Sequence, residues 1–152
     1  FYLNYYSTFA DLSKYLMDCK REAEMKGYTL TIFGRRRYFP DIKSPIPFIK
    51  AAAERMAINA PIQGTSADMI KIALVQIDAW IKHEKIGDKV AIVATVHDEL
   101  IFEVDDNDSE FVEKTIIHIR KVMESVLNTL GKDKLVPIET SVKMGKSWGG
   151  AV

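Results

Sequence analysis

This sequence has little cysteine, no net charge and no long hydrophobic run. Its 152 residues include one cysteine, Cys19, which excludes a disulfide framework and a cysteine-based zinc site and favours a reducing, cytoplasmic setting. No apolar stretch approaches the roughly 18 residues that cross a bilayer, and no signal peptide is visible, so no membrane partner is expected. The sequence begins with Phe1 and its first methionine is Met17, so we expect a fragment of a longer chain.

The charges balance overall but are segregated along the chain. Lysine plus arginine and aspartate plus glutamate each total 21, which argues against a uniformly basic nucleic-acid-binding surface. Residues 26–50 nevertheless carry six basic side chains and one acidic one, whereas residues 98–113 carry eight acidic side chains and no lysine or arginine. This pattern suits a protein that holds polyanions and divalent cations, although ordinary surface scatter produces such runs as well.

Apolar periodicity in the first half predicts helices around a short hairpin. A helix through about residue 26 ends at Gly27, a strand covers residues 28–33, and a turn at Gly34 returns the chain to Tyr38. Residues 40–47 contain three prolines and are predicted to be a loop.

Two further helices are expected between Phe48 and Gly87. The first begins near Phe48 and ends at Pro61, because proline normally terminates a helix. The second follows Gly64, where Thr65 and Asp68 have the spacing of a capping box, and it ends before Gly87.

The second half reads as helix, strand, strand, helix and strand. The strands are predicted at residues 89–95, 100–104 and 136–143, with a helix that starts at Asn107 or Asp108. The predicted fold class is therefore α+β, a small antiparallel sheet covered by helices on one face.

The tetrad Val96-His97-Asp98-Glu99 separates two apolar runs of strand length. A tight turn there holds two adjacent carboxylates at a rigid but open hairpin tip, where a hard cation such as Mg²⁺ can be bound by oxygen ligands. The alternative is that aspartate is simply a common turn residue.

Two basic or amide-bearing sets also stand out. Arg55 and Asn59 lie four residues apart, on one helical face, and Gln63 follows just past Pro61, so all three suit phosphate oxygens or minor-groove acceptors. Helix capping and a surface salt bridge explain the same residues without a ligand. Similarly, the Gly34-Arg35-Arg36-Arg37 turn is either a phosphate contact or a solvated loop.

Taken together, these segments resemble one protein family over essentially the whole chain. The similarity lies in residues 31–37, 54–65, 96–104 and 145–148, and the strings RMAINAPIQGT at 55–65 and VHDEL at 96–100 are specific. The chain resembles the C-terminal portion of the bacterial DNA polymerase I type, that is, the family A DNA polymerases.

The resemblance implies roles for individual residues. Asp98 corresponds to one of two aspartates that hold catalytic Mg²⁺, Glu99 is its acidic neighbour with a weaker claim as a ligand, and His97 corresponds to a histidine beside the primer terminus. The resemblance also implies that Arg55, Asn59 and Gln63 follow the minor groove and template. The turn of Arg35, Arg36 and Arg37 would lie near the incoming nucleotide and the duplex backbone, with Arg35 and Arg36 the stronger candidates.

The implied activity is template-directed DNA synthesis with two Mg²⁺ ions, acting on primer–template DNA and a deoxynucleoside triphosphate. The resemblance places residues 1–64 in the rear of the fingers and residues 65–152 in the C-terminal half of the palm. The family's other metal-binding aspartate and its nucleotide-gripping helix come earlier and are not in this sequence. The remaining polymerase domains are therefore expected partners, and the isolated chain is expected to be inactive.

Two other functional classes stay open at this point. A non-catalytic duplex-binding module would bind DNA with a steep salt dependence and no Mg²⁺ requirement. An inert remnant, stable only against its missing parts, would show exposed apolar edges and no DNA affinity.

Overall fold

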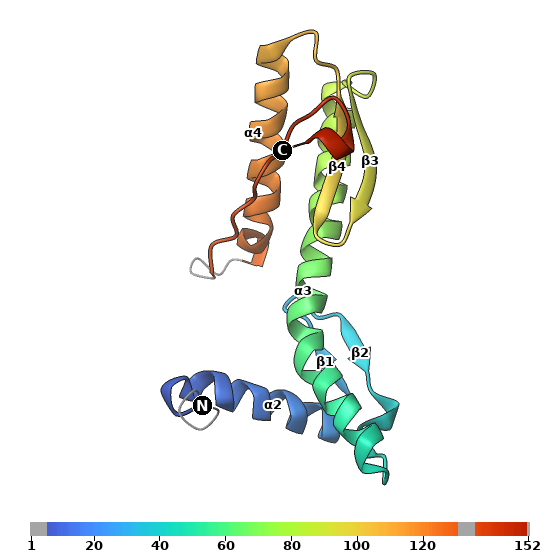
Figure 1. The fold of residues 1–152 in the computed structure, drawn as a ribbon, viewed down its shortest axis with the longest axis vertical. Coiled ribbons are helices and arrows are strands. Elements are labelled where there is room, and N and C mark those ends of the chain that lie inside the picture. Colours follow the sequence, from blue (N-terminus) through green and yellow to red (C-terminus); the bar gives the residue numbers. More distant parts are fainter. Residues whose placement is uncertain (1–5, 131–135, 152) are drawn as a thin grey trace. The chain divides into compact units, whose positions relative to one another are not determined.

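The computed structural model describes residues 6–130 and 136–151, and the chain divides into two compact units, Phe1–Ser66 and Ala67–Val152 (Figure 1). Each unit combines helical segments with one two-stranded antiparallel sheet. This composition confirms the predicted α+β class.

The first unit opens with helix α2 (Ala10–Lys26) and continues with a hairpin of β1 (Tyr28–Leu30) and β2 (Arg36–Tyr38). Gly27 ends α2 as predicted, with a left-handed φ of 77° and its N–H bonded to the Ala23 carbonyl at 2.8 Å. The first five residues of the predicted helix lie outside the described residues.

Strand β1 is three residues shorter than predicted, because the chain turns at once. The Gly34 N–H donates to the Thr31 carbonyl and the Thr31 N–H donates to the Arg35 carbonyl, both at 2.9 Å, which closes a tight turn over residues 31–34. The loop expected at residues 40–47 contains a short 3-10 helix, η1 (Pro40–Lys43).

Alanines dominate the core of the first unit. The core consists of Ala23 from α2, Phe39 and Ile42 from the segment after β2, and Ala53, Ala57 and Ala60 from the next helix. Small side chains let helix backbones approach closely while keeping the interior well packed. Two partly exposed ion pairs, Lys20–Glu54 at 3.1 Å and Lys50–Glu24 at 2.8 Å, link α2 to this next helix. Near the surface they add little stability.

Helix α3 (Pro47–Glu84) is a single helix of 38 residues that continues through Pro61 and Gly64. The predicted end at Pro61 and the predicted second start after Gly64 are therefore wrong, and Thr65 and Asp68 form no capping box. Proline removes one backbone donor from a helix, whereas the buried alanines before Pro61 and the buried Ala73, Ile77 and Ile81 after it hold the flanking turns in place.

The second unit contains a longer hairpin and another helix. Strands β3 (Val90–Val96) and β4 (Glu99–Val104) pair antiparallel, with a register shift between Ile92 and Ala94. Helix α4 (Ser109–Ser125) starts as predicted at Asp108, whose carboxylate accepts hydrogen bonds from the amides of Glu110 and Phe111. It passes into a 3-10 turn, η2 (Val126–Leu130), whose first residue is buried.

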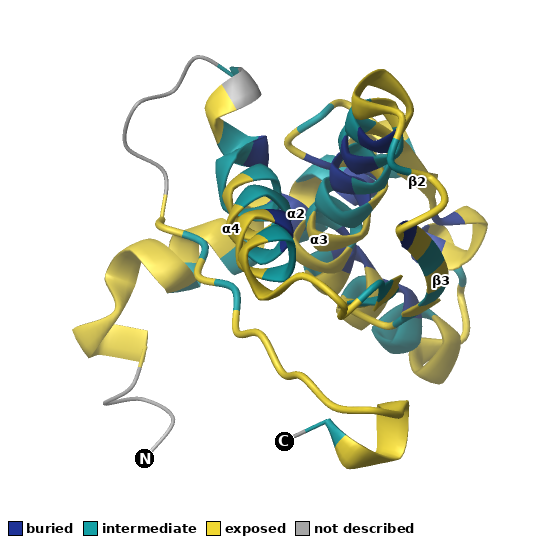
Figure 2. Ribbon diagram, turned by 90° about the horizontal axis from the view of Figure 1, so that it is seen from above, coloured by how far each residue is buried: buried dark blue, intermediate teal, exposed yellow. Residues whose placement is uncertain are grey.

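The strand predicted at residues 136–143 is absent. This segment is irregular and its residues are exposed or intermediate (Figure 2), and a further 3-10 turn, η3 (Trp148–Gly150), follows it. A strand needs a neighbouring strand for its N–H and C=O groups, and here the Thr140 N–H donates instead to the Glu124 carboxylate at 3.0 Å. No helix in the described residues is long and apolar enough to span a membrane.

Replacing Gly64 with alanine tests how closely the first hairpin approaches α3. A Cβ atom at residue 64 would lie 2.7 Å from Thr31 Cγ2, and Thr31 Oγ1 is held by a 3.1 Å bond from the Arg35 amide. We expect Gly64→Ala to lower the free energy of unfolding by about 1–3 kcal/mol, measured by urea unfolding. Gly87→Ala is the control, because its Cβ would meet only Ile81 at 3.9 Å; equal stability of the two variants would contradict the close approach.

The bond between Glu124 and Thr140 makes the 136–143 segment sensitive to acid. Hydrogen bonds from the Thr140 amide and from Arg120 lower the pKa of Glu124. A lowered folded-state pKa gives stabilisation that is present above the ordinary glutamate pKa and is lost as the pH falls through the lowered value. We therefore expect the protection of the Thr140 amide against hydrogen exchange to vanish in acid. Glu124→Ala should abolish it at neutral pH, whereas Glu113→Ala should leave it intact; protection that is independent of pH would contradict this.

Candidate functional site

The tetrad forms the tip of the β3–β4 hairpin, as predicted. Val96 pairs with Glu99, so His97 and Asp98 are the two residues of the turn. His97 has a positive φ of 54°, and Asp98 is not among the residues with positive φ. A positive φ at the first turn position is a feature of the primed two-residue hairpin turns, whose twist matches that of the flanking strands. His97, Asp98 and Glu99 are all exposed on this rigid support.

The turn offers part of a divalent-cation site. Asp98 and Glu99 supply carboxylate oxygens, the ligands that Mg²⁺ prefers. Within residues 6–130 and 136–151, no group of three or more histidine, cysteine, aspartate or glutamate side chains is arranged to hold a metal ion. The residues therefore fit Mg²⁺ in kind but supply only some of the ligands that a complete site requires.

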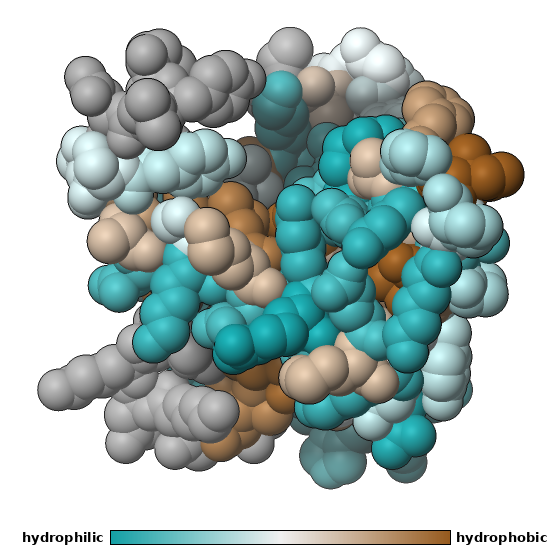
Figure 3. Space-filling model, turned by 90° about the horizontal axis from the view of Figure 1, so that it is seen from below, coloured by the Kyte–Doolittle hydropathy of each residue, from teal (hydrophilic) through white to brown (hydrophobic). Residues whose placement is uncertain are grey.

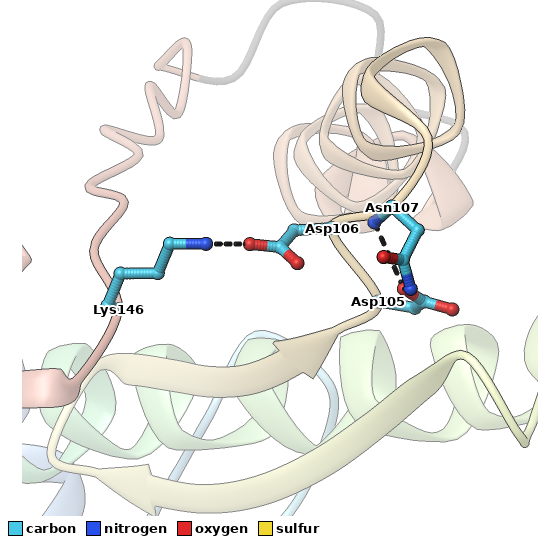
Figure 4. Close-up of polar contacts among 4 residues, drawn as sticks. All are labelled: Asp105, Asp106, Asn107 and Lys146. Atoms are coloured by element: carbon cyan, nitrogen blue, oxygen red, sulfur yellow. Dashed lines mark hydrogen bonds and ion pairs between the residues drawn. The ribbon is translucent and has the colours of Figure 1, made fainter.

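Several other acidic residues of this segment have partners of their own. Asp106 pairs with Lys146, which lowers the pKa of Asp106, and Asp105 accepts a 3.0 Å hydrogen bond from the Asn107 amide (Figure 4). Asp108 caps α4. The cluster of acids at residues 98–113 thus tethers the C-terminal segment and starts a helix, and its members do not gather around Asp98.

Arg55, Asn59 and Gln63 form a row along α3. All three are exposed, and their spacing of four residues places them on one helical face over a length of about 12 Å. Gln63 lies inside the helix rather than past its end as predicted, because α3 does not stop at Pro61. The continuous helix therefore presents three hydrogen-bonding side chains in a fixed line.

The three arginines of the first hairpin have three different environments. Arg35 Nη2 donates to the Gly64 carbonyl at 3.0 Å, and Arg37 lies over the Phe39 ring at 5.8 Å. Arg36 lies over the Tyr28 ring at 4.8 Å, and a hydrogen bond with the Tyr38 side chain raises the pKa of Arg36. Hydrophilic side chains cover much of the molecular face shown in Figure 3.

Sequence reasoning missed the residues that support these arginines. Tyr28 and Tyr38 are cross-strand partners with ring centroids 5.4 Å apart, and Thr65 Oγ1 accepts a 3.1 Å hydrogen bond from the Ile32 N–H. The tyrosines were visible as strand residues flanking the arginine turn. Thr65 carried no such signal, since its partner lies 33 residues earlier.

Comparison with known proteins identifies the family. The model for "DNA polymerase family A" matches residues 1–150. The chain belongs to DNA polymerase family A. It is 42% identical over 147 residues to DNA polymerase I of Mycobacterium leprae, and 40% identical to that of Rhizobium leguminosarum, covering 97% of this chain in both cases. The matches span 15% and 14% of the length of those polymerases.

A solved structure shows the same fold. The structure is the "POL domain of Pol1 from M. smegmatis complex with DNA primer-template and dNTP", with a TM-score of 0.79 and 40% identity over 95% of this chain. The match covers 24% of that chain. This family A chain is therefore a partial polymerase domain by fold. The hairpin turn and the α3 row lie in different units of it, and each is described by itself.

His97 occupies a backbone conformation that normally favours glycine. A side chain in the left-handed region costs about 1–2 kcal/mol, so we expect His97→Gly to raise the free energy of unfolding by up to about 1 kcal/mol. His97→Ala is the matched control, because it removes the imidazole and keeps the Cβ atom. Chemical unfolding of the three proteins checks this, and equal stability of the glycine and alanine variants would show that the turn is unstrained.

Proposed function

We propose that this chain contributes to template-directed DNA synthesis as part of a longer polymerase. The reaction is transfer of a nucleotide to the primer 3′-hydroxyl group. The observation that carries the proposal is the family A match over residues 1–150 together with two exposed carboxylates on a rigid hairpin turn. The structurally similar Mycobacterium smegmatis domain is itself a complex with primer–template DNA and a nucleotide.

The β3–β4 turn provides the residues that this chain contributes to the catalytic centre. Asp98, the residue at the tip, is the proposed Mg²⁺ ligand, and Glu99 is a second acidic group beside it. Bound Mg²⁺ supplies charge stabilisation for the transferred phosphate and the leaving pyrophosphate. His97, one residue before Asp98, carries ring nitrogens that can donate a hydrogen bond to a phosphate oxygen at the primer terminus.

The row on α3 is proposed to contact the minor groove and template. Arg55 brings guanidinium donors, and Asn59 and Gln63 bring amide donors, without any acidic group among them. All base pairs present acceptors in the minor groove at similar places, so such donors contact every correct pair without reading its sequence. A straight row on one helix suits this task, because the contacts must keep a fixed spacing along the duplex.

The two units correspond to two parts of a polymerase. We assign residues 1–64 to the rear of the fingers and residues 65–152 to the C-terminal half of the palm. The boundary between the compact units, after Ser66, supports this division. Two carboxylates at one turn do not make a site for two ions, so the other metal-binding carboxylate must come from outside these residues. We therefore expect the isolated chain to be inactive.

Asp98→Ala is the direct test of the metal role. The test uses a chimera in which residues 1–152 replace the matching segment of the Mycobacterium leprae polymerase. Losing a metal ligand removes stabilisation of the transition state, so we expect primer extension at saturating Mg²⁺ to slow at least about a hundredfold. Affinity for primer–template DNA should stay within about twofold, because no phosphate contact is removed.

Asp88→Ala serves as the control for this experiment. Asp88 is an exposed aspartate just before the other end of β3, so its loss should leave extension unchanged. Normal extension by the Asp98 variant would refute the metal assignment. Salt-dependent duplex binding by a chimera that does not extend primers at all would favour a non-catalytic DNA-binding role.

A further inference from the structure

The β1–β2 hairpin is fastened to α3 by two side chains that sequence reasoning left without this role. Thr65 Oγ1 donates to the Pro61 carbonyl at 2.6 Å and accepts from the Ile32 N–H at 3.1 Å. Arg35 Nη2 donates to the Gly64 carbonyl at 3.0 Å. All of these residues lie in the first unit.

The geometry at Gly64 shows that these contacts depend on a close approach. A Cβ atom there would come within 2.7 Å of Thr31 Cγ2 and 3.2 Å of Arg35 Nη2. Thr31 is 7% exposed, and its hydroxyl oxygen accepts from the Arg35 amide at 3.1 Å. The turn and the helix thus touch where the helix has no side chain, and the helix carbonyl becomes accessible to the arginine.

The next residue, Arg36, is the first residue of β2 and has different contacts. Its guanidinium lies over the Tyr28 ring at 4.8 Å and is hydrogen-bonded to Tyr38. A planar cation held by two aromatic side chains is pre-oriented and keeps donors for a phosphate.

We propose that Arg35 and Thr65 are positioning residues that clamp the hairpin on α3, and that Arg36 is the arginine that contacts the DNA phosphate backbone. This inference deepens the proposed function and depends on it for the DNA contact. It changes the role expected for Arg35 from a contact with the nucleotide or DNA to a contact within the protein, because Arg35 Nη2 donates to the Gly64 carbonyl. The clamp sets the position of the strand, and the strand sets the position of Arg36.

Hydrogen exchange on the 152-residue chain tests the clamp without DNA. Removing either hydrogen bond should raise the exchange rate of the Ile32 amide about tenfold or more, so we expect this for Arg35→Ala and Thr65→Val. Thr65→Ser keeps the hydroxyl group and should restore protection. Ser66→Ala, at the next hydroxyl on the helix, and Arg36→Ala should leave the exchange rate unchanged. Unaltered exchange in the Arg35 and Thr65 variants would overturn the clamp.

A double-mutant cycle tests whether the clamp acts through Arg36. The affinity of the chain for a fluorescein-labelled primer–template duplex is measured over a range of NaCl concentrations. We expect Arg36→Ala to reduce the slope of log Kd against log[NaCl] by about one. Thr65→Val, which changes no charge, should weaken binding, and so should Arg35→Ala. Neither should weaken it further when Arg36 is already alanine.

The outcomes separate the two proposals. If the losses of DNA-binding free energy caused by Arg35→Ala and Arg36→Ala add fully in the double variant, Arg35 contacts phosphate itself. That result would overturn its positioning role. If the unaltered chain binds no duplex, the result counts against the DNA contact in the proposed function. The hydrogen-exchange rates of the Ile32 amide still show whether Arg35 and Thr65 clamp the hairpin on α3.

Discussion

The continuity of helix α3 through Pro61 is the constraint on which the rest of the structure depends. The same helix supplies three of the six core residues of the first unit and the carbonyl and hydroxyl groups that hold the first hairpin. It also supplies the buried residues Ala73, Ile77 and Ile81 of the second unit. A break at Pro61 would separate Gln63 from Arg55 and Asn59 and would move Thr65 away from Ile32. Proline at this position costs one backbone hydrogen bond. Packing on both sides of it offsets that cost.

The sequence correctly predicted those helices and strands whose ends are set by interactions between residues close together in the chain. Gly27 takes the left-handed conformation that ends α2, and Asp108 accepts the first amides of α4. The β3–β4 hairpin follows from two β-branched runs around a two-residue turn. In each case the deciding interaction lies within a few residues, so the sequence window contains it.

The failures have non-local causes. Pro61 and Gly64 look like helix breakers in a window of ten residues, but the hairpin that packs against Gly64 comes about 30 residues earlier. The segment at 136–143 alternates like a strand, yet alternation supplies no partner for backbone groups, and Glu124 takes the Thr140 amide instead. The candidate site shows the same division: the turn at His97 was predictable from local pattern, whereas the different environments of Arg35 and Arg36 were not.

The zero net charge of the chain conceals which charges remain available for a ligand. Many charged side chains pair with each other, as in Lys50–Glu24, Lys20–Glu54 and Lys146–Asp106, and the opposite charges of a pair cancel each other's field at a distance. Within residues 6–130 and 136–151, no ion pair involves Arg36, Arg55, Asp98 or Glu99.

These four residues are charged members of the set proposed to contact phosphate, the minor groove and Mg²⁺. An exposed charge that forms no ion pair within the described residues can be neutralised by a ligand without first breaking such a pair. Which charges are paired within the chain, more than its net charge, therefore determines how a neutral domain can bind both a polyanion and a cation.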